Sequence, residues 1–161
     1  MIKLIPMTET EFKAYLEEDI KEYAEVNVRN GYWDETEALE KSKQAHDQLL
    51  PDGPATKDQH LFSVIDETSG DAVGVLWLEI KADRPTPAAF IYDIKINEGL
   101  RGRGYGRQTL YAAENLLRSM NIKTLSLHVF SDNTAAKRLY EKVGFETISY
   151  NMRKVLLHRN H

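Results

Sequence analysis

Apolar residues recur along the chain at two spacings, alternating in some stretches and three or four apart in others. Alternating or short apolar runs predict strands at residues 2–7, 60–66, 72–80, 88–96 and 124–130, and one or two closing strands at 146–157. Helical spacing predicts helices at residues 9–30, 34–50, from about 107 to 120, and 131–145. The expected order is therefore β-α-α-β-β-β-α-β-α-β.

Local signals mark several helix ends. Thr8 with Glu11 three residues later has the form of a capping box, which predicts the start of the first long helix. Gly31 is expected to end that helix, and Gly144 the last one. Hairpins in the first half and β-α-β crossovers in the second predict an α/β (α+β) fold with a mixed sheet, flanked by about four helices. We expect a single domain over residues 1–161.

Composition narrows the function classes. A net charge of −4 argues against a nucleic-acid partner, because such domains carry a basic footprint. The five histidines lack the spacing of a metal site, so no metal is expected, and the absence of cysteine excludes a thiolate or disulfide. No run is long and apolar enough for a membrane span and no signal-peptide core is visible, which favours a cytoplasmic protein without a membrane partner.

The stretch INEGLRGRGYGRQTL, residues 96–110, concentrates glycine and positive charge between a predicted strand and a predicted helix. A helix N-terminus presents free backbone N–H groups and a positive dipole, which together suit an anion. Gly104 and Gly106 allow a ligand to approach the backbone closely, and Arg101, Arg103 and Arg107 add charge. The corner predicts a phosphate site, although it matches neither a Walker loop nor a Rossmann motif.

The pattern R-x-x-G-x-G over residues 101–106 resembles the coenzyme A signature of the GNAT superfamily of acyl-CoA-dependent N-acetyltransferases. Further along, residues 133–145 resemble the second signature of that family, N-x-x-A-x-x-L-Y-x-x-x-G-F. The expected order of elements also resembles the family fold. The stretches AFIYD and LSLHVF are most similar to the bacterial YycN-like group, which narrows the fold but not the substrate.

The resemblance implies that acetyl-CoA is the cosubstrate. It implies that backbone amides at the glycine-arginine corner hold the pyrophosphate, and that the strand ending at Ile96 pairs with the pantetheine arm. The residues expected to contact the coenzyme are Ile94, Ile96, Arg101, Gly102, Arg103, Gly104, Tyr105, Gly106, Arg107, Asn133 and Lys137. Asn133 also fits a helix N-cap, and Lys137 also fits an exposed helix charge.

Acetyl transfer to an amine needs a base for the ammonium, donors for the oxyanion and an acid for the thiolate. The resemblance implies that Tyr140 is the acid, and backbone N–H groups around residues 94–96 are expected to meet the oxyanion. Two residues are candidates for the base, His128 and Asp93, and the sequence leaves them open. Strand alternation predicts that Tyr92 and Ile94 face away from Asp93.

The leading hypothesis is an N-acetyltransferase that acts on a primary amine, either of a small molecule or of a peptide. Tyr32 and Trp33, between the first two helices, either wall the acceptor site or fill the core. The alternative functions are a non-catalytic acyl-CoA-binding or sensing module and a nucleotide-binding protein that uses the same corner. A homodimer through the closing strands is a further hypothesis about partners.

Overall fold

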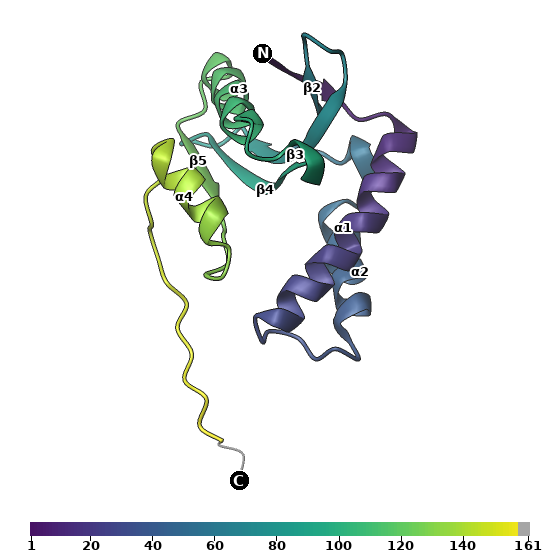
Figure 1. Ribbon diagram of the computed structural model, residues 1–161, viewed down its shortest axis with the longest axis vertical. Helices are drawn as coiled ribbons and strands as arrows, with labels where there is room; N and C mark the ends of the chain where they lie inside the picture. Colours follow the sequence, from purple (N-terminus) through teal and green to yellow (C-terminus); the bar gives the residue numbers. More distant parts are fainter. Residues whose placement is uncertain (158–161) are drawn as a thin grey trace.

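The computed structural model describes residues 1–157, over which the chain forms one five-stranded sheet with helices on both faces (Figure 1). The strands are β1 (Ile2–Pro6), β2 (Gln59–Asp66), β3 (Ala72–Lys81), β4 (Ala88–Ile96) and β5 (Thr124–Leu127). The α-helices are α1 (Glu9–Arg29), α2 (Ala38–Leu49), α3 (Tyr105–Ser119) and α4 (Thr134–Lys142). Two short 3-10 helices, η1 (Gly53–Ala55) and η2 (Glu98–Leu100), complete the elements. The prediction of a mixed sheet with four helices is confirmed.

The strands lie in the order β1-β2-β3-β4-β5. The first four are antiparallel, whereas β4 and β5 are parallel and pair only from Ala88↔Thr124 to Ile91↔Leu127. The rest of β4, residues 92–96, has no strand beside it on that edge within residues 1–157. The two strands therefore part about halfway along β4 and leave backbone groups in its second half free.

Alternation along the strands gives the sheet two apolar faces. One face packs against α3, with a buried core formed by Phe62, Val64, Val73, Leu76, Leu78, Ile80, Ala89, Ile91, Leu110, Ala113 and Leu117. The opposite face packs against α1 and the end of α2, with a core formed by Met7, Phe12, Tyr15, Leu50, Leu61 and Trp77. Leu139, Tyr140 and Val143 bring α4 to the α3 side. None of the helices within residues 1–157 is long and apolar enough to span a bilayer.

The first helix begins as predicted. The Thr8 hydroxyl accepts from the Glu11 N–H at 3.1 Å, and the Glu11 carboxylate accepts from the Thr8 N–H at 2.8 Å, which completes the capping box. The helix ends at Arg29, and Gly31 follows with φ of +74°. This stop lets the chain turn back, so that α2 packs against α1.

Several boundaries differ from the prediction, and one of them is the shorter α4, which runs over Thr134–Lys142 and not over residues 131–145. Helix α2 begins at Ala38 instead of residue 34, because the Asp34 carboxylate accepts from the Thr36 N–H at 3.3 Å and stabilises a turn. Strand β5 ends at Leu127, so residues 128–130 continue without a ladder. The prediction of closing strands at 146–157 is wrong for the single chain: these residues are extended, exposed and unpaired, and they run away from the sheet (Figure 1).

Candidate active site

A β-bulge in β4 shapes the site. Trp77 of β3 pairs with Asp93, but the next residue, Leu78, pairs with Ile91, so Tyr92 is an extra residue in the ladder. The Tyr92 ring lies 4.9 Å from the Trp77 ring, and the Asp93 carboxylate meets Tyr15 of α1. Both side chains therefore turn toward the α1 face. The prediction that Tyr92 and Asp93 face opposite sides is wrong, because simple alternation fails at a bulge.

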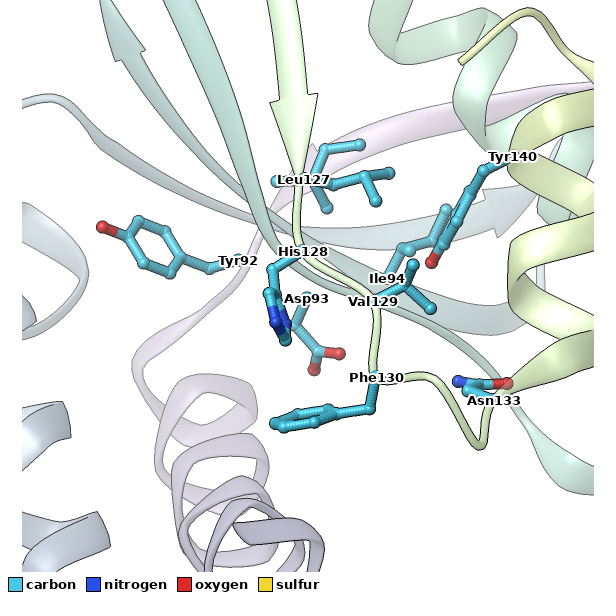
Figure 2. A pocket seen from close by; sticks show the side chains of 10 residues that line it. Tyr92, Asp93, Ile94, Leu127, His128, Val129, Phe130, Asn133 and Tyr140 are labelled. Carbon is cyan, nitrogen blue, oxygen red and sulfur yellow. The ribbon is translucent and has the colours of Figure 1, made fainter. Parts of the chain in front are cut away.

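A cavity of about 140 Å³ opens where β4 and β5 part (Figure 2). Its wall is made by β4, by the segment that follows β5 and by α4. The lining residues are Ile91, Tyr92, Asp93, Ile94, Leu127, His128, Val129, Phe130, Asn133 and Tyr140. The fold thus brings together all three residues that the sequence proposed for acid and base chemistry: Tyr140, His128 and Asp93.

Tyr140 reaches the cavity from α4, with its hydroxyl directed toward the parted strands (Figure 2). Its ring packs against Phe145 with centroids 5.7 Å apart, which holds it at the edge of the core. Burial, with a smaller contribution from the charge of Asp93, raises the pKa of Tyr140 to about 12. The phenol is therefore protonated at neutral pH and can donate a hydrogen bond into the cavity.

Asp93 is held from behind by the first helix. The Tyr15 hydroxyl donates to Oδ2 of Asp93 at 2.7 Å. Burial and the negative charge of Asp19 raise the pKa of Asp93 to about 7, while Lys95 and the Tyr15 hydrogen bond oppose the shift. A carboxyl group that titrates near neutral pH exchanges its proton under the conditions in which most enzymes work.

A polar network that the sequence analysis missed lies behind Asp93. Nε2 of His46 is 2.7 Å from the Asp19 carboxylate, and Nδ1 of His46 is 2.8 Å from the Ser42 carbonyl. Burial is the largest single influence and lowers the pKa of His46, but the hydrogen bonds to Asp19 and Ser42 and the charges of Asp19 and Asp93 together outweigh it, so the pKa is raised. Both ring nitrogens face acceptors, so the geometry suits a protonated imidazole beside an ionised Asp19.

Lys95 and Glu22 form a second ion pair close to this network. Burial lowers and the Glu22 hydrogen bond raises the pKa of Lys95, with a net rise. The sequence did contain a signal, since Tyr15, Asp19 and Glu22 share the helical face that also carries Phe12. Polar residues at these spacings on an apolar face indicate buried partners: strand β4 supplies Asp93 and Lys95, and helix α2 supplies His46.

His128 reaches the same cavity from the other side, just after β5 ends. Its ring meets Phe130 edge-on, with centroids 4.7 Å apart, and the side chain is exposed. His128 has no hydrogen-bond partner among the residues that the structure describes. No hydrogen bond to these residues therefore orients its ring, whereas the Tyr15 hydroxyl holds Asp93.

The glycine-arginine corner forms the N-terminus of α3. Gly102 and Gly104 have φ of +80° and +84°, a region that other residues rarely adopt. The first backbone bond of the helix runs from the Gln108 N–H to the Gly104 carbonyl. Within residues 1–157, the N–H groups of residues 102–107 donate to no protein acceptor. Six consecutive N–H groups and a helix dipole therefore remain available to an anion.

Side chains around the corner have defined positions. A Cβ on Gly106 would lie 3.0 Å from Cδ2 of Leu139, so this glycine lets α3 approach α4. Arg101 donates from Nε to the Ile96 carbonyl at 3.1 Å, which links the corner to the free end of β4. The Tyr105 hydroxyl donates to Asp66 at 2.6 Å, so its side chain turns away and only its N–H is available to a ligand.

Some of the remaining candidate residues line the cavity, and the others lie outside it. Asn133 lines the cavity and also caps α4, because its side-chain oxygen accepts from the Ala136 N–H at 3.2 Å. Ile94 lines the cavity, whereas Ile96 lies at the end of β4 near Arg101. Lys137 is exposed on α4 and does not line the cavity. Arg103 and Arg107 are exposed at the corner.

Tyr32 and Trp33 take different positions. The Tyr32 ring lies 6.1 Å from the Phe130 ring and remains about half exposed, which places it beside the cavity mouth. Trp33 packs edge-on against Tyr23 of α1 at 5.4 Å. Of the two alternatives open from the sequence, Tyr32 therefore fits a wall of the acceptor side and Trp33 fits packing.

Comparisons with known proteins agree with this geometry. The profile of the acetyltransferase (GNAT) family matches residues 20–145. An uncharacterized N-acetyltransferase, YycN of Bacillus subtilis (strain 168), is 43% identical over 155 residues, which are 96% of this chain and 99% of that protein. The mycothiol acetyltransferase of Nocardia farcinica is 35% identical over 86 residues, 53% of this chain and 28% of that protein.

Solved structures of other proteins share the fold of this chain. The crystal structure of YycN from Bacillus subtilis superposes with a TM-score of 0.93 at 42% identity, covering 98% of this chain and all of that one. The structure of AAC(6')-Iy in complex with the bisubstrate analog CoA-S-monomethyl-acetylneamine has a TM-score of 0.56 at 15% identity and covers all of this chain and 99% of that one. The second likeness concerns the fold alone.

Proposed function

Since the chain belongs to the GNAT family of acetyltransferases, we propose that it transfers an acetyl group from acetyl-CoA directly to a primary amine. One observation carries the proposal. The open edge of β4 joins an anion-binding corner, at Arg101, to a cavity that contains a phenol and a carboxyl group, at Tyr140 and Asp93. A long cosubstrate with phosphates at one end and a thioester at the other fits such a path.

The chain's own groups suit acetyl-CoA. The free N–H groups of residues 102–107 would hold the pyrophosphate, with Arg101, Arg103 and Arg107 around it. Backbone groups of β4 from residue 94 to 96 would pair with the pantetheine arm, and Asn133 would contact it from α4. Bound there, the cosubstrate supplies a thioester carbonyl to the cavity. Lys137 would reach only the outer, exposed part of the molecule.

We assign the general base to Asp93. An ordinary carboxylate has a pKa near ~4, too low to take a proton from an ammonium group at ~8 to ~10. The elevated pKa of Asp93, about 7, reduces that difference by about three units. Its fixed hydrogen bond to Tyr15 also holds the carboxylate in one orientation. His128 is the second candidate for the base. Because its side chain is exposed, it would serve as the base only for an acceptor that enters the cavity from the solvent side of His128.

Tyr140 would act at the sulfur. As the C–N bond forms and the C–S bond breaks, the ammonium loses two protons, of which one ends on the thiol and one in solvent. A thiol has a pKa of ~8.5, well below the value of about 12 for Tyr140, so full transfer from the phenol would be uphill. Tyr140 would therefore stabilise the departing thiolate with a hydrogen bond and keep its own proton, while the thiolate takes one of the two protons that the ammonium releases. Backbone N–H groups of β4 beyond the bulge, around residues 94–96, would meet the oxyanion.

The surroundings of the cavity support a cationic acceptor. The aromatic rings of Tyr32, Tyr92, His128 and Phe130 stand around its mouth. Aromatic faces attract ammonium groups, and the carboxyl group of Asp93 lies behind them. This favours a primary amine that is charged in solution, whether it belongs to a small molecule or to a peptide N-terminus.

The test is release of thiol from acetyl-CoA with a panel of amines, including polyamines, amino acids and peptides. The chain contains no cysteine, so the protein adds no thiol signal of its own. Catalysis predicts amine-dependent release that Asp93→Asn lowers by about 10²–10⁴-fold. His128→Gln serves as the matched comparison and should lose less than about tenfold.

Two outcomes would reject the proposal. Micromolar binding of acetyl-CoA without thiol release for any amine would support the alternative, an acyl-CoA-binding or sensing module. Equal binding of ADP and acetyl-CoA would show that the pantetheine arm has no site and would favour a nucleotide ligand. If His128→Gln lost far more activity than Asp93→Asn, the base would be His128.

A further inference from the structure

A buried ion pair lies behind the carboxyl group of Asp93 and outside the cavity. Nε2 of His46, on α2, is 2.7 Å from Oδ2 of Asp19, on α1. The side chains of His46 and Asp19 are only 4% and 13% exposed, and neither lines the cavity. Burying two charges costs desolvation energy, and apolar side chains of similar volume often stabilise a fold as well or better. Fold stability alone is therefore a poor reason for this pair, and its neighbour Asp93 suggests another.

Contacts with three residues hold His46 in one position. Nδ1 of His46 is 2.8 Å from the Ser42 carbonyl, so both ring nitrogens face acceptors and the ring suits the protonated form. The ring also packs against the Tyr23 and Trp77 rings, with centroids 5.7 Å and 6.0 Å apart. A ring held in this way in turn fixes the carboxylate of Asp19.

Helix α1 brings the charge of Asp19 close to Asp93. Tyr15 and Asp19 are four positions apart on α1, so their side chains lie on the same face of the helix. The Tyr15 hydroxyl donates to Oδ2 of Asp93 at 2.7 Å, which places that face against the carboxyl group. After burial, which is the larger cause, the negative charge of Asp19 raises the pKa of Asp93. A carboxylate held beside a second carboxyl group makes the second bind its proton more tightly.

Charged or titratable groups from several elements surround Asp93. They are Tyr15, Asp19 and Glu22 from α1, His46 from α2, Lys95 from β4, His128 after β5 and Tyr140 from α4. The positive charge of Lys95 acts against that of Asp19, because it lowers the pKa of Asp93. Lys95 is itself paired with Glu22, which offsets part of its charge. Asp19 is therefore the charged neighbour that strengthens Asp93 as a base.

We propose that His46 and Asp19 are positioning residues for the general base. The imidazolium of His46 holds Asp19 in place as an anion, and this anion makes Asp93 a stronger base toward the ammonium group of the acceptor. Neither residue touches the substrate, and both act through Asp93. The inference rests on the proposed function, because it requires Asp93 to take the proton of the acceptor.

Two variants of similar shape test the proposal, because they change the charge near Asp93 in opposite senses. Asp19→Asn removes a negative charge and keeps an oxygen for His46, so the titration of Asp93 should move to lower pH by about one unit. His46→Gln removes a positive charge and keeps a donor for Asp19, so the two carboxyl groups should release their last proton at higher pH. Carbon-13 NMR of the carboxyl groups follows both titrations in the full-length protein, and Asp93→Asn identifies the signal. Shifts in the same direction, or no shift in either variant, would overturn the proposal.

Ser42→Ala is the matched structural control. The fully buried Ser42 hydroxyl donates to the Ile20 carbonyl at 2.7 Å, which helps to hold α2 against α1. The substitution removes this contact but changes no charge, and it keeps the Ser42 carbonyl for His46. It should lower the unfolding temperature and leave the titration of Asp93 in place. A shift as large as that of Asp19→Asn would mean that the pair acts through packing alone.

The charge of His46 can be read in the natural protein without any variant. Nitrogen-15 spectra should show protons on both ring nitrogens in most molecules at pH 6.5, the ordinary pKa of a histidine, because the pKa of His46 is raised. The ring is assigned through its contacts with Tyr23 and Trp77. A neutral ring at that pH would overturn the proposal, because no positive charge would then hold Asp19.

The pH dependence of acetyl transfer separates this inference from the proposed function. The acidic limb of kcat/KM should follow the NMR titrations, to lower pH in Asp19→Asn and to higher pH in His46→Gln. NMR titrations that do not move would reject the role of the pair and leave the proposed function intact. NMR titrations that move without the activity limb would reject Asp93 as the base, and the role of the pair with it.

Discussion

The Tyr15 hydroxyl of α1 donates a 2.7 Å hydrogen bond to the Asp93 carboxylate of β4, across 78 positions of sequence. The contact depends on the bulge at Tyr92, which turns Asp93 toward α1. The negative charge of Asp19, one turn after Tyr15 on α1, also raises the pKa of Asp93. The first helix therefore orients the carboxyl group in the cavity and, after burial as the larger cause, contributes to its raised pKa.

Tyr15→Phe should shift the pH dependence of acetyl transfer. The Tyr15 hydrogen bond stabilises the ionised carboxylate, so its loss raises the pKa of Asp93 above its value of about 7. A base acts in its deprotonated form, so the acidic limb of kcat/KM should move to higher pH. A hydrogen bond to a charged group is worth about 1.5 kcal/mol, which corresponds to about one pH unit. An unchanged limb in the pH–rate profile would exclude Asp93 as the titrating group.

Asp93 should also make folding stability depend on pH. Its pKa is about 7 in the native state against an ordinary value of 3.8, so the native state binds more protons between these two values. Stability should therefore fall as the pH rises from about 4 to about 7. The shift of about three units sets an upper bound of about 4 kcal/mol.

Asp93→Asn removes this pH dependence of stability and keeps an amide oxygen that can accept the Tyr15 hydrogen bond. The variant should unfold at a higher denaturant concentration than the natural protein at pH 8, and the difference should vanish near pH 4. Denaturant titrations at the two pH values measure it. A gain that is equal at both pH values would mean that ionisation of Asp93 is not its cause.

The ordinary patterns of the sequence predicted most of the fold for clear physical reasons. The capping box at Thr8 is a local interaction, and its geometry is present as expected. Strand β4 ends where the apolar alternation ends. The glycines at 102 and 104 occupy positive φ, as a turn before a helix requires. Each of these features depends on neighbours close in sequence.

Long-range features escaped prediction. The bulge at Tyr92 arises from the register between β3 and β4, which no local signal determines. The pairing of Asp19 with His46 joins two helices, so it depended on their packing. The closing strands predicted after residue 146 are absent, because the alternation of apolar residues does not determine whether a sheet edge is available to the segment.

Gly104→Ala should weaken the coenzyme site. With φ of +84°, a side chain at this position costs about 1–2 kcal/mol of strain, and the corner would relax toward another shape. Affinity for acetyl-CoA should fall at least about tenfold in calorimetry, together with a lower unfolding temperature. Gly99→Ala is the matched control, because Gly99 has no positive φ and no atom within 4 Å of an added Cβ. Equal affinity in both variants would place the pyrophosphate elsewhere.

Tyr140→Phe separates binding from chemistry. The phenol faces the cavity and is half-buried against Phe145, so its ring can be kept while the hydroxyl is removed. The loss of a donor that acts mainly on the departing sulfur should lower kcat about 10²-fold and change KM for acetyl-CoA by less than about threefold. Steady-state thiol release with a saturating amine measures both constants. An acyl donor whose thiol is more acidic has a better leaving group, which needs less stabilisation by Tyr140. With such a thioester, Tyr140→Phe should therefore lose less activity relative to the natural enzyme. If the natural enzyme and Tyr140→Phe responded equally to thiol acidity, Tyr140 would have no part in departure of the sulfur.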